Sequence, residues 1–157
     1  MSDITIHNKF EPLRTADSRY FVLTGGRGSG KSYSATLLEA INTFSEGYNC
    51  LYTRYTMTSG NQTANLKALQ GISTWVLDEA EEMVDENDFD TIDLSIRSNV
   101  QQNRIILILN PTTKEHFIYK RFFESMGVEA GFNGTVGNVT YIHTTYKDNS
   151  DNLPESF

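Results

Sequence analysis

The segment "FVLTGGRGSGKSYSATLLEA", residues 21–40, places four glycines, an arginine and a lysine between an apolar run and a helix-forming run. Glycines at this density cost conformational entropy on folding, so the backbone there must adopt a shape that side chains would block. Residues 25–32 match the pattern G-x-x-x-x-G-K-[ST]. Because a buried strand precedes the pattern and an amphipathic helix follows it, this segment is predicted to be a phosphate-binding loop.

The residue types in this loop suit a nucleoside triphosphate. Successive backbone N–H groups and the positive end of the following helix would form an anion cradle. Lys31 supplies a positive charge to the β- and γ-phosphates, and Ser32 offers a hydroxyl to Mg²⁺. A glycine-rich turn with a solvated lysine is the weaker interpretation, because it does not explain the strand and helix on either side. The predicted cofactors are ATP and Mg²⁺, and the loop residues expected around the phosphates are Gly25, Gly26, Arg27, Gly28, Ser29 and Gly30.

A pair of carboxylates follows another apolar run, in "ISTWVLDEAEE", residues 72–82. A carboxylate at the carboxyl end of a buried strand lies at the mouth of an α/β sheet, where ligands bind. We expect Asp78 to hold Mg²⁺ through water, and Glu79 to polarise the attacking water as a general base. The alternative is an acidic helix start, which the helix dipole favours. The phosphate-binding loop favours the catalytic interpretation, and a glutamate directly after the aspartate indicates a motor-type ATPase rather than a GTPase or kinase.

A third polar group ends a strand in "RIILILNPTTKEHF", residues 104–117. Pro111 stops the strand after Asn110, so the Asn110 amide is expected to point into the same crevice. There it would sense the γ-phosphate or orient water. The alternative is that Asn110 caps a helix that begins at Lys114.

The order of the predicted elements indicates an α/β fold. Several strands are apolar at consecutive positions, which is typical of a parallel sheet covered on both faces. At 157 residues the chain is expected to form a single domain, 1–157. The expected strands are Tyr20–Thr24, Asn49–Thr53, Thr74–Asp78, Ile105–Asn110 and Val139–Thr144, and the expected helices are Lys31–Phe44, Phe89–Asn99 and Lys114–Ser125.

Composition excludes several classes of protein. No run of about 18 apolar residues is present, so no membrane span is predicted. Cys50 is the only cysteine, which excludes a disulfide framework and fits a reducing compartment. The net charge of −7 gives no support for a general nucleic-acid-binding surface.

Six phrases together resemble the ATPase domain of bacteriophage terminase large subunits, the DNA-packaging motors. They cover most of the chain, and the series "GGRGSGKS", "DEAEEM" and "ILNPT" is far more specific than the loop alone. The phrases are "RYFVLTGGRGSGKS", "LYTRY", "NQTANLKALQGISTWVLDEAEEM", "DLSIRS", "NRIILILNPTTKEHFIYKRFF" and "HTTYKDNSDNLPESF".

The resemblance implies a RecA-like P-loop NTPase sandwich of the additional-strand, catalytic-glutamate class, with a mainly parallel central sheet and helices on both faces. It implies that Arg27 acts in cis on the phosphates. Arg54 and Arg97 are weaker candidates for an arginine finger acting in trans, and each could instead make a structural salt bridge. The family also places adenine contacts before the first strand, where this chain has Phe10, Pro12 and Arg14.

By the same resemblance, the domain would power translocation of viral double-stranded DNA into the procapsid, in the host cytoplasm. The implied partners are the small terminase subunit, the portal protein and further copies in a homo-oligomeric ring. Two departures from the family pattern stand out: we expect no nuclease activity from this chain, and the segment near residues 58–62 is short. The alternatives are a P-loop nucleotide-binding module or a small-molecule kinase that does not act on DNA, although the sequence shows no arginine-rich lid.

Overall fold

The computed structural model describes residues 6–54 and 71–152, and within them the chain forms a six-stranded sheet in the order β2-β3-β4-β1-β6-β5. Neighbouring strands run parallel from β2 through to β6, and β5 pairs antiparallel with β6 at the edge. The strands are β1 (Tyr20–Gly25), β2 (Cys50–Arg54), β3 (Thr74–Asp78), β4 (Arg104–Leu109), β5 (Gly134–Val136) and β6 (Val139–Thr144).

Burial explains why these strands were recognisable in the sequence. Every residue of β3 and β4 is buried, as consecutive apolar residues predict for strands covered on both faces. All five expected strands are confirmed, with ends that agree to within one residue. The short edge strand β5 was not predicted, since it is mostly exposed and contains no apolar run.

In the sheet, one further strand lies between β1 and β3, the two strands that lead into the predicted site motifs. β1 precedes the predicted phosphate-binding loop and β3 ends at Asp78, yet these strands do not pair with each other. Instead, β4 lies between them and pairs with both. This inserted strand is what the additional-strand class requires, so the predicted α/β fold class is confirmed.

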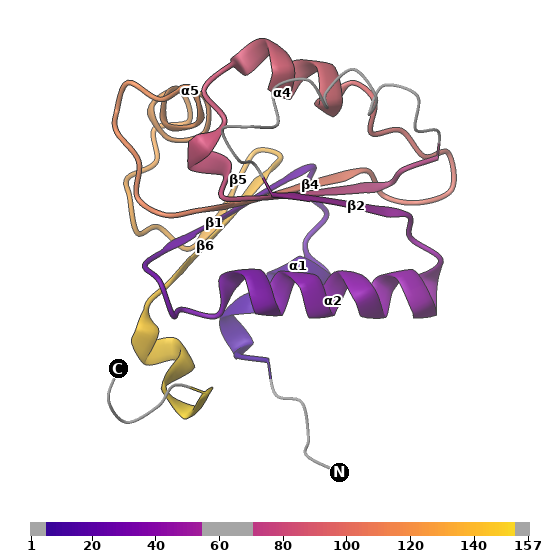
Figure 1. Ribbon diagram of the computed structural model, residues 1–157, viewed down its shortest axis with the longest axis horizontal. Helices are drawn as coiled ribbons and strands as arrows, with labels where there is room; N and C mark the ends of the chain where they lie inside the picture. Colours follow the sequence, from indigo (N-terminus) through magenta and orange to yellow (C-terminus); the bar gives the residue numbers. More distant parts are fainter. Residues whose placement is uncertain (1–5, 55–70, 153–157) are drawn as a thin grey trace.

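Helices cover both faces of the sheet (Figure 1). α1 and α2 lie on one face, where Leu13 and Leu38 belong to one apolar core, and α4 and α5 lie on the other, where Phe89 and Phe117 belong to a second. The helices are α1 (Pro12–Thr15), α2 (Lys31–Glu46), α4 (Glu86–Asp93) and α5 (Phe117–Tyr119), which continues as the π-helical turn η3 (Lys120–Glu124). Short 3₁₀ turns are η1 (Asn8–Phe10), η2 (Ala80–Glu82) and η4 (Tyr146–Asn152).

The boundaries of two predicted helices were wrong. The helix expected at Phe89–Asn99 is α4, which begins at Glu86 because the Asp85 side chain accepts a hydrogen bond from the Asn87 backbone N–H and so caps it. It ends at Asp93, well before the expected end. The helix expected from Lys114 is also misplaced, as α5 begins at Phe117 and changes to π-helical hydrogen bonding after Tyr119.

The start of α5 has a local cause. The His116 side chain accepts a hydrogen bond from the Ile118 backbone N–H at 3.2 Å, so His116 is the N-cap of this helix. By contrast, α2 begins where predicted and runs to Glu46, two residues beyond the expected Phe44. It ends there because Gly47 adopts a left-handed conformation, with φ of 71°.

A buried ion pair links α2 to the sheet. Arg104 on β4 contacts the Glu39 carboxylate at 2.6 Å, and Arg104 also donates a hydrogen bond to the Leu13 carbonyl at 2.7 Å. Burial of Glu39 raises its pKa, and the neighbouring Arg104 opposes that rise. The contact therefore joins three elements that lie far apart in the sequence.

No helix in the described part of the chain is both long and apolar enough to cross a membrane. The short segment near residues 58–62 lies outside the residues that the structure describes.

Candidate active site

The carboxyl ends of the parallel strands form one edge of the sheet, and a cavity of about 370 Å³ opens there. Such an edge is where ligands bind in open α/β sheets, and the volume lies within the range of small-molecule sites. The cavity is lined by the loop residues 26–32, by Tyr33, by Arg54 at the end of β2, by Asp78 at the end of β3 with Glu79 after it, and by Ile108, Leu109 and Asn110 on and after β4. The fold thus brings the three sequence-predicted groups of site residues together.

The loop itself follows β1 and leads into α2. Gly28 and Gly30 have φ of 75° and 79°, a left-handed conformation that residues with side chains rarely adopt. Gly25 has φ of 142°, and a Cβ there would lie 1.9 Å from the Thr144 carbonyl oxygen at the end of β6. Gly26 is different, since a Cβ built on it meets no atom within 4 Å. The loop backbone is therefore held tightly against β6 at its first glycine.

Lys31 begins α2 and is almost fully buried, at 7 % exposure. Its ammonium donates hydrogen bonds to the Gly25 carbonyl at 2.7 Å, the Gly26 carbonyl at 2.9 Å and the Ser29 hydroxyl at 3.1 Å. Burial lowers the pKa of Lys31, while the negative charges of Glu81 and Asp78 partly offset that effect. A buried ammonium held in a loop of this shape is suited to exchange its carbonyl partners for phosphate oxygens.

Asp78 lies at the end of β3 and is 4 % exposed. Its two oxygens accept hydrogen bonds from the Ser32 hydroxyl at 2.9 Å and from the Tyr52 hydroxyl at 2.8 Å. A serine hydroxyl beside one carboxylate is the oxygen ligand set that Mg²⁺ uses when phosphates and water supply the rest. The residues present therefore fit the metal. Tyr52 was missed in the sequence, where the only sign is its position on a strand leading to the same edge.

Glu79 has an unusual backbone conformation, with φ of 56° and ψ of 44°. Residues other than glycine rarely occupy this left-handed region, and strained residues of this kind cluster at functional sites. The turn directs Glu79 toward the cavity, where its carboxylate is 3.6 Å from the Arg54 Nε. Arg54 also lies 3.3 Å from Asp78. Arg54 thus pairs in cis with both motif carboxylates, as the salt-bridge interpretation of this residue expects.

Asn110 follows β4 and lines the cavity, as predicted. Its amide nitrogen donates a hydrogen bond to the Glu81 carboxylate at 2.5 Å. The alternative role, as a cap for a helix beginning at Lys114, is wrong because that helix begins at Phe117 and has His116 as its cap. Glu81 was missed in the sequence, where it was only one member of an acidic run.

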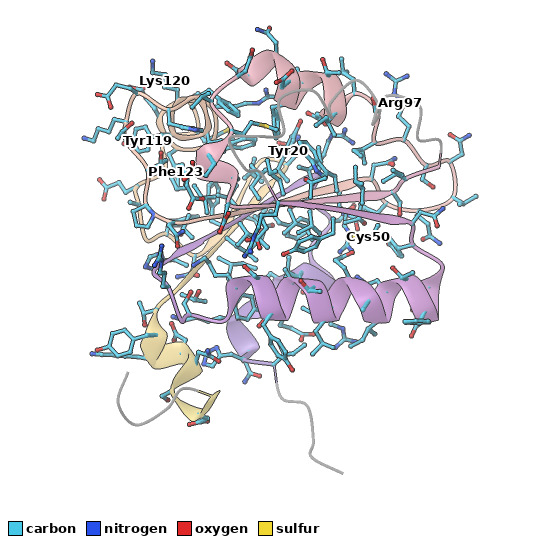
Figure 2. All side chains as sticks on the ribbon, in the orientation of Figure 1. Tyr20, Cys50, Arg97, Tyr119, Lys120 and Phe123 are labelled. Carbon is cyan, nitrogen blue, oxygen red and sulfur yellow. The ribbon has the colours of Figure 1, made fainter. Side chains whose placement is uncertain are left out.

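The remaining arginine candidates occupy two different places. Arg27 lies in the loop and lines the cavity. Figure 2 shows Arg97 near the other end of the strands. There Arg97, Asn49 and Ser73 line a separate hollow by the amino ends of β2 and β3. The structure brings Arg27 to the site and leaves Arg97 outside it.

The residues expected to contact adenine do not line the cavity. Phe10 is 1 % exposed and packs in the core between α2 and the sheet, so its ring is not available to a base. Pro12 begins α1, and Arg14 pairs with Glu11 at 3.7 Å on the surface. A contact that sequence reasoning missed comes from η4, where the Asn149 amide donates to the Gly28 carbonyl at 2.8 Å.

A match to one solved structure, an N-terminal packaging ATPase domain, supports the fold. The N-terminal domain of the DNA packaging ATPase from bacteriophage phi29 matches with a TM-score of 0.66 and 13 % identity, over 88 % of this chain and 96 % of that one. The large terminase from a thermophilic bacteriophage matches with a TM-score of 0.48 and 16 % identity. That match covers 94 % of this chain but 39 % of the thermophilic phage protein.

The same thermophilic phage terminase in complex with ADP gives a TM-score of 0.42 and 15 % identity. No curated protein matches the chain. The sequence profile of the phage terminase large subunit family matches residues 53–157, which include Asp78, Glu79 and Asn110. The chain therefore belongs to the phage terminase large subunit family.

Proposed function

We propose that this domain hydrolyses Mg²⁺-ATP and that hydrolysis powers the movement of viral double-stranded DNA into a procapsid. The observation that carries the proposal is the meeting of Lys31, the Ser32–Asp78 pair and Glu79 at one cavity. These groups supply phosphate binding, metal binding and a general base, which are the parts that ATP hydrolysis requires.

Binding comes first and depends on the loop. Its backbone N–H groups and the positive end of α2 would surround the phosphates. Lys31 would leave the carbonyls of Gly25 and Gly26 and pair with phosphate oxygens instead. Because the buried ammonium gains a strong partner, nucleotide binding should stabilise the charged form of Lys31.

The metal would be held by Ser32 and Asp78, directly or through water, and when bound it neutralises charge on the phosphates. Asp78 is already oriented by Ser32 and Tyr52. Glu79 would accept the proton of the attacking water, provided that its carboxylate is released from Arg54. Arg27 is the residue we propose to stabilise negative charge on the phosphates in cis.

The proposed partners are supported by family membership and by no particular residue of this domain. We propose that the domain acts on double-stranded DNA together with a portal protein and a small terminase subunit, in the host cytoplasm. We also propose that copies of the chain assemble as a ring. In such a ring a neighbouring subunit could compete for the carboxylates that Arg54 now holds.

The direct test is release of phosphate from Mg²⁺-ATP over a wide range of protein concentrations. Glu79→Gln should bind nucleotide and lose hydrolysis, since only the water-polarising group is removed, and Lys31→Ala should lose binding. Glu82→Gln is the matched control, because Glu82 is an exposed glutamate of the same turn and should leave the rate unchanged. Tight ATP binding by Lys31→Ala would refute the assignment of the loop.

The dependence on concentration separates the proposal from its alternatives. A rate per chain that rises with concentration would indicate that a neighbour completes the site. Turnover that is independent of concentration and absent in Glu79→Gln would mean that the residues of one chain suffice. Binding without turnover at any concentration would favour a nucleotide-binding module instead.

A further inference from the structure

A carboxylate outside the predicted motif pair holds the amide of Asn110. Glu81 Oε1 lies 2.5 Å from Asn110 Nδ2. An ionised carboxylate only accepts hydrogen bonds, so the group facing it must be the NH₂ of Asn110 and not its carbonyl oxygen. The contact therefore decides which way the Asn110 amide faces in the cavity.

The fold explains why these two residues meet. β3 and β4 are paired neighbours, with Asp78 opposite Ile108. After Asp78, the left-handed turn at Glu79 leads into η2, which contacts β4. Glu81 lies in η2 and Asn110 lies just past the end of β4, so the turn at Glu79 brings a third carboxylate against the neighbouring strand end.

The second oxygen of Glu81 is unusual. Among the residues that the structure describes, Glu81 Oε2 is buried and has no hydrogen-bond partner. Buried acceptors are nearly always paired, so an unpaired one requires an explanation. Glu81 is also close enough to Lys31 for its negative charge to act on that ammonium. Glu81 thus has one oxygen on Asn110, one oxygen free, and a charge that acts on the phosphate-binding lysine.

We propose that Glu81 is a positioning residue that orients the Asn110 amide for contact with the γ-phosphate, so that the site distinguishes a nucleoside triphosphate from a diphosphate. This proposal rests on the proposed nucleotide-binding function. One N–H of Asn110 is donated to Glu81. The second N–H would then donate to the terminal phosphate, and the carbonyl oxygen of the Asn110 amide would accept from the water beside it. Glu81 itself does not touch the nucleotide and acts through Asn110.

A purely structural role for Glu81 makes a different prediction. If the contact only held η2 against β4, loss of Glu81 would make the site less stable and would weaken the binding of both nucleotides equally. If Glu81 orients Asn110, loss of either residue should affect only the nucleotide that has a γ-phosphate. The discrimination ratio, the Kd for Mg²⁺-ADP divided by the Kd for Mg²⁺-ATPγS, separates these cases without requiring turnover.

The experiment is calorimetric titration of Mg²⁺-ADP and Mg²⁺-ATPγS into the full chain and its variants. Glu81→Ala and Asn110→Ala should each keep the affinity for ADP within about twofold. Each should lower the affinity for ATPγS by about tenfold, which is the effect expected from the loss of one hydrogen bond to a charged group. The double variant should lose no more than either single variant, because both changes remove one interaction.

Two further variants serve as controls. Glu81→Gln keeps an oxygen that accepts the Asn110 N–H, so it should retain most of the discrimination. Glu82→Ala removes an exposed carboxylate from the same turn and should change neither affinity. Equal losses for both nucleotides in Glu81→Ala, or additive losses in the double variant, would overturn the role of Glu81. If the unsubstituted chain bound neither nucleotide, the proposed function itself would be refuted.

Discussion

The first glycine of the phosphate-binding loop should be far less replaceable than the second. In Gly25→Ala, the new Cβ would lie 1.9 Å from the Thr144 carbonyl oxygen, which is backbone and cannot rotate away. The φ of 142° at Gly25 is also one that alanine rarely adopts. The clash would push β1 away from β6, and the backbone strain at residue 25 would distort the loop between β1 and α2.

The expected cost follows from these two terms. A residue forced into a glycine-only conformation costs about 1–3 kcal/mol, and overpacking of a tight site costs a further amount of about 1–3 kcal/mol. Alanine recovers about 0.4–1 kcal/mol by restricting the unfolded chain. The midpoints of these ranges give a net loss of about 3 kcal/mol, which would lower Tm by about 6–12 °C for a chain of this size.

Gly26→Ala is the matched control, because Gly26 has no positive φ and a Cβ there meets nothing within 4 Å. Its Tm should change by less than about 3 °C. Thermal unfolding followed by circular dichroism, without nucleotide, measures both variants. If Gly25→Ala melted within about 3 °C of Gly26→Ala, contact with the end of β6 would not constrain the loop and the reasoning would fail.

Three other predictions follow from buried groups. Burial lowers the pKa of Lys31 from the ordinary lysine value of 10.5. As pH rises, nucleotide affinity should therefore begin to fall at a pH below 10.5, because Lys31 loses its charge there. Lys31→Arg should remove that pH dependence in fluorescence titrations. Glu39→Ala leaves the Arg104 charge buried without its partner, which should cost about 3–5 kcal/mol, whereas Glu39→Leu combined with Arg104→Met should recover most of the loss in denaturant unfolding. Burial raises the pKa of the Cys50 thiol to about 12, so in the folded protein at pH 8 it should react with a disulfide reagent at least about tenfold more slowly than a free thiol, and denaturant should abolish the difference.

Local sequence patterns were sufficient to predict an element when all of its residues share the same degree of burial. β3 and β4 are buried at every position, and so their consecutive apolar residues revealed them. The loop from Gly25 to Ser32 was predictable because the proposed binding of phosphate requires a fixed spacing of glycines, lysine and serine. The α4 and α5 boundaries were wrong because helix ends depend on capping contacts of single side chains, here those of Asp85 and His116.

The amino-acid sequence by itself determined the strands, the glycine-rich loop proposed to bind phosphate and the position of the Asp78–Glu79 pair at the end of a strand, since these depend on residues next to one another in the chain. The tertiary structure alone decided the strand order and the partners of those residues. The Tyr52 contact with Asp78 spans 26 residues, the Glu81 contact with Asn110 spans 29, and the Asn149 contact with Gly28 spans 121. No local pattern records such pairs, because they form only when parallel strands from distant parts of the chain end at the same edge of the sheet.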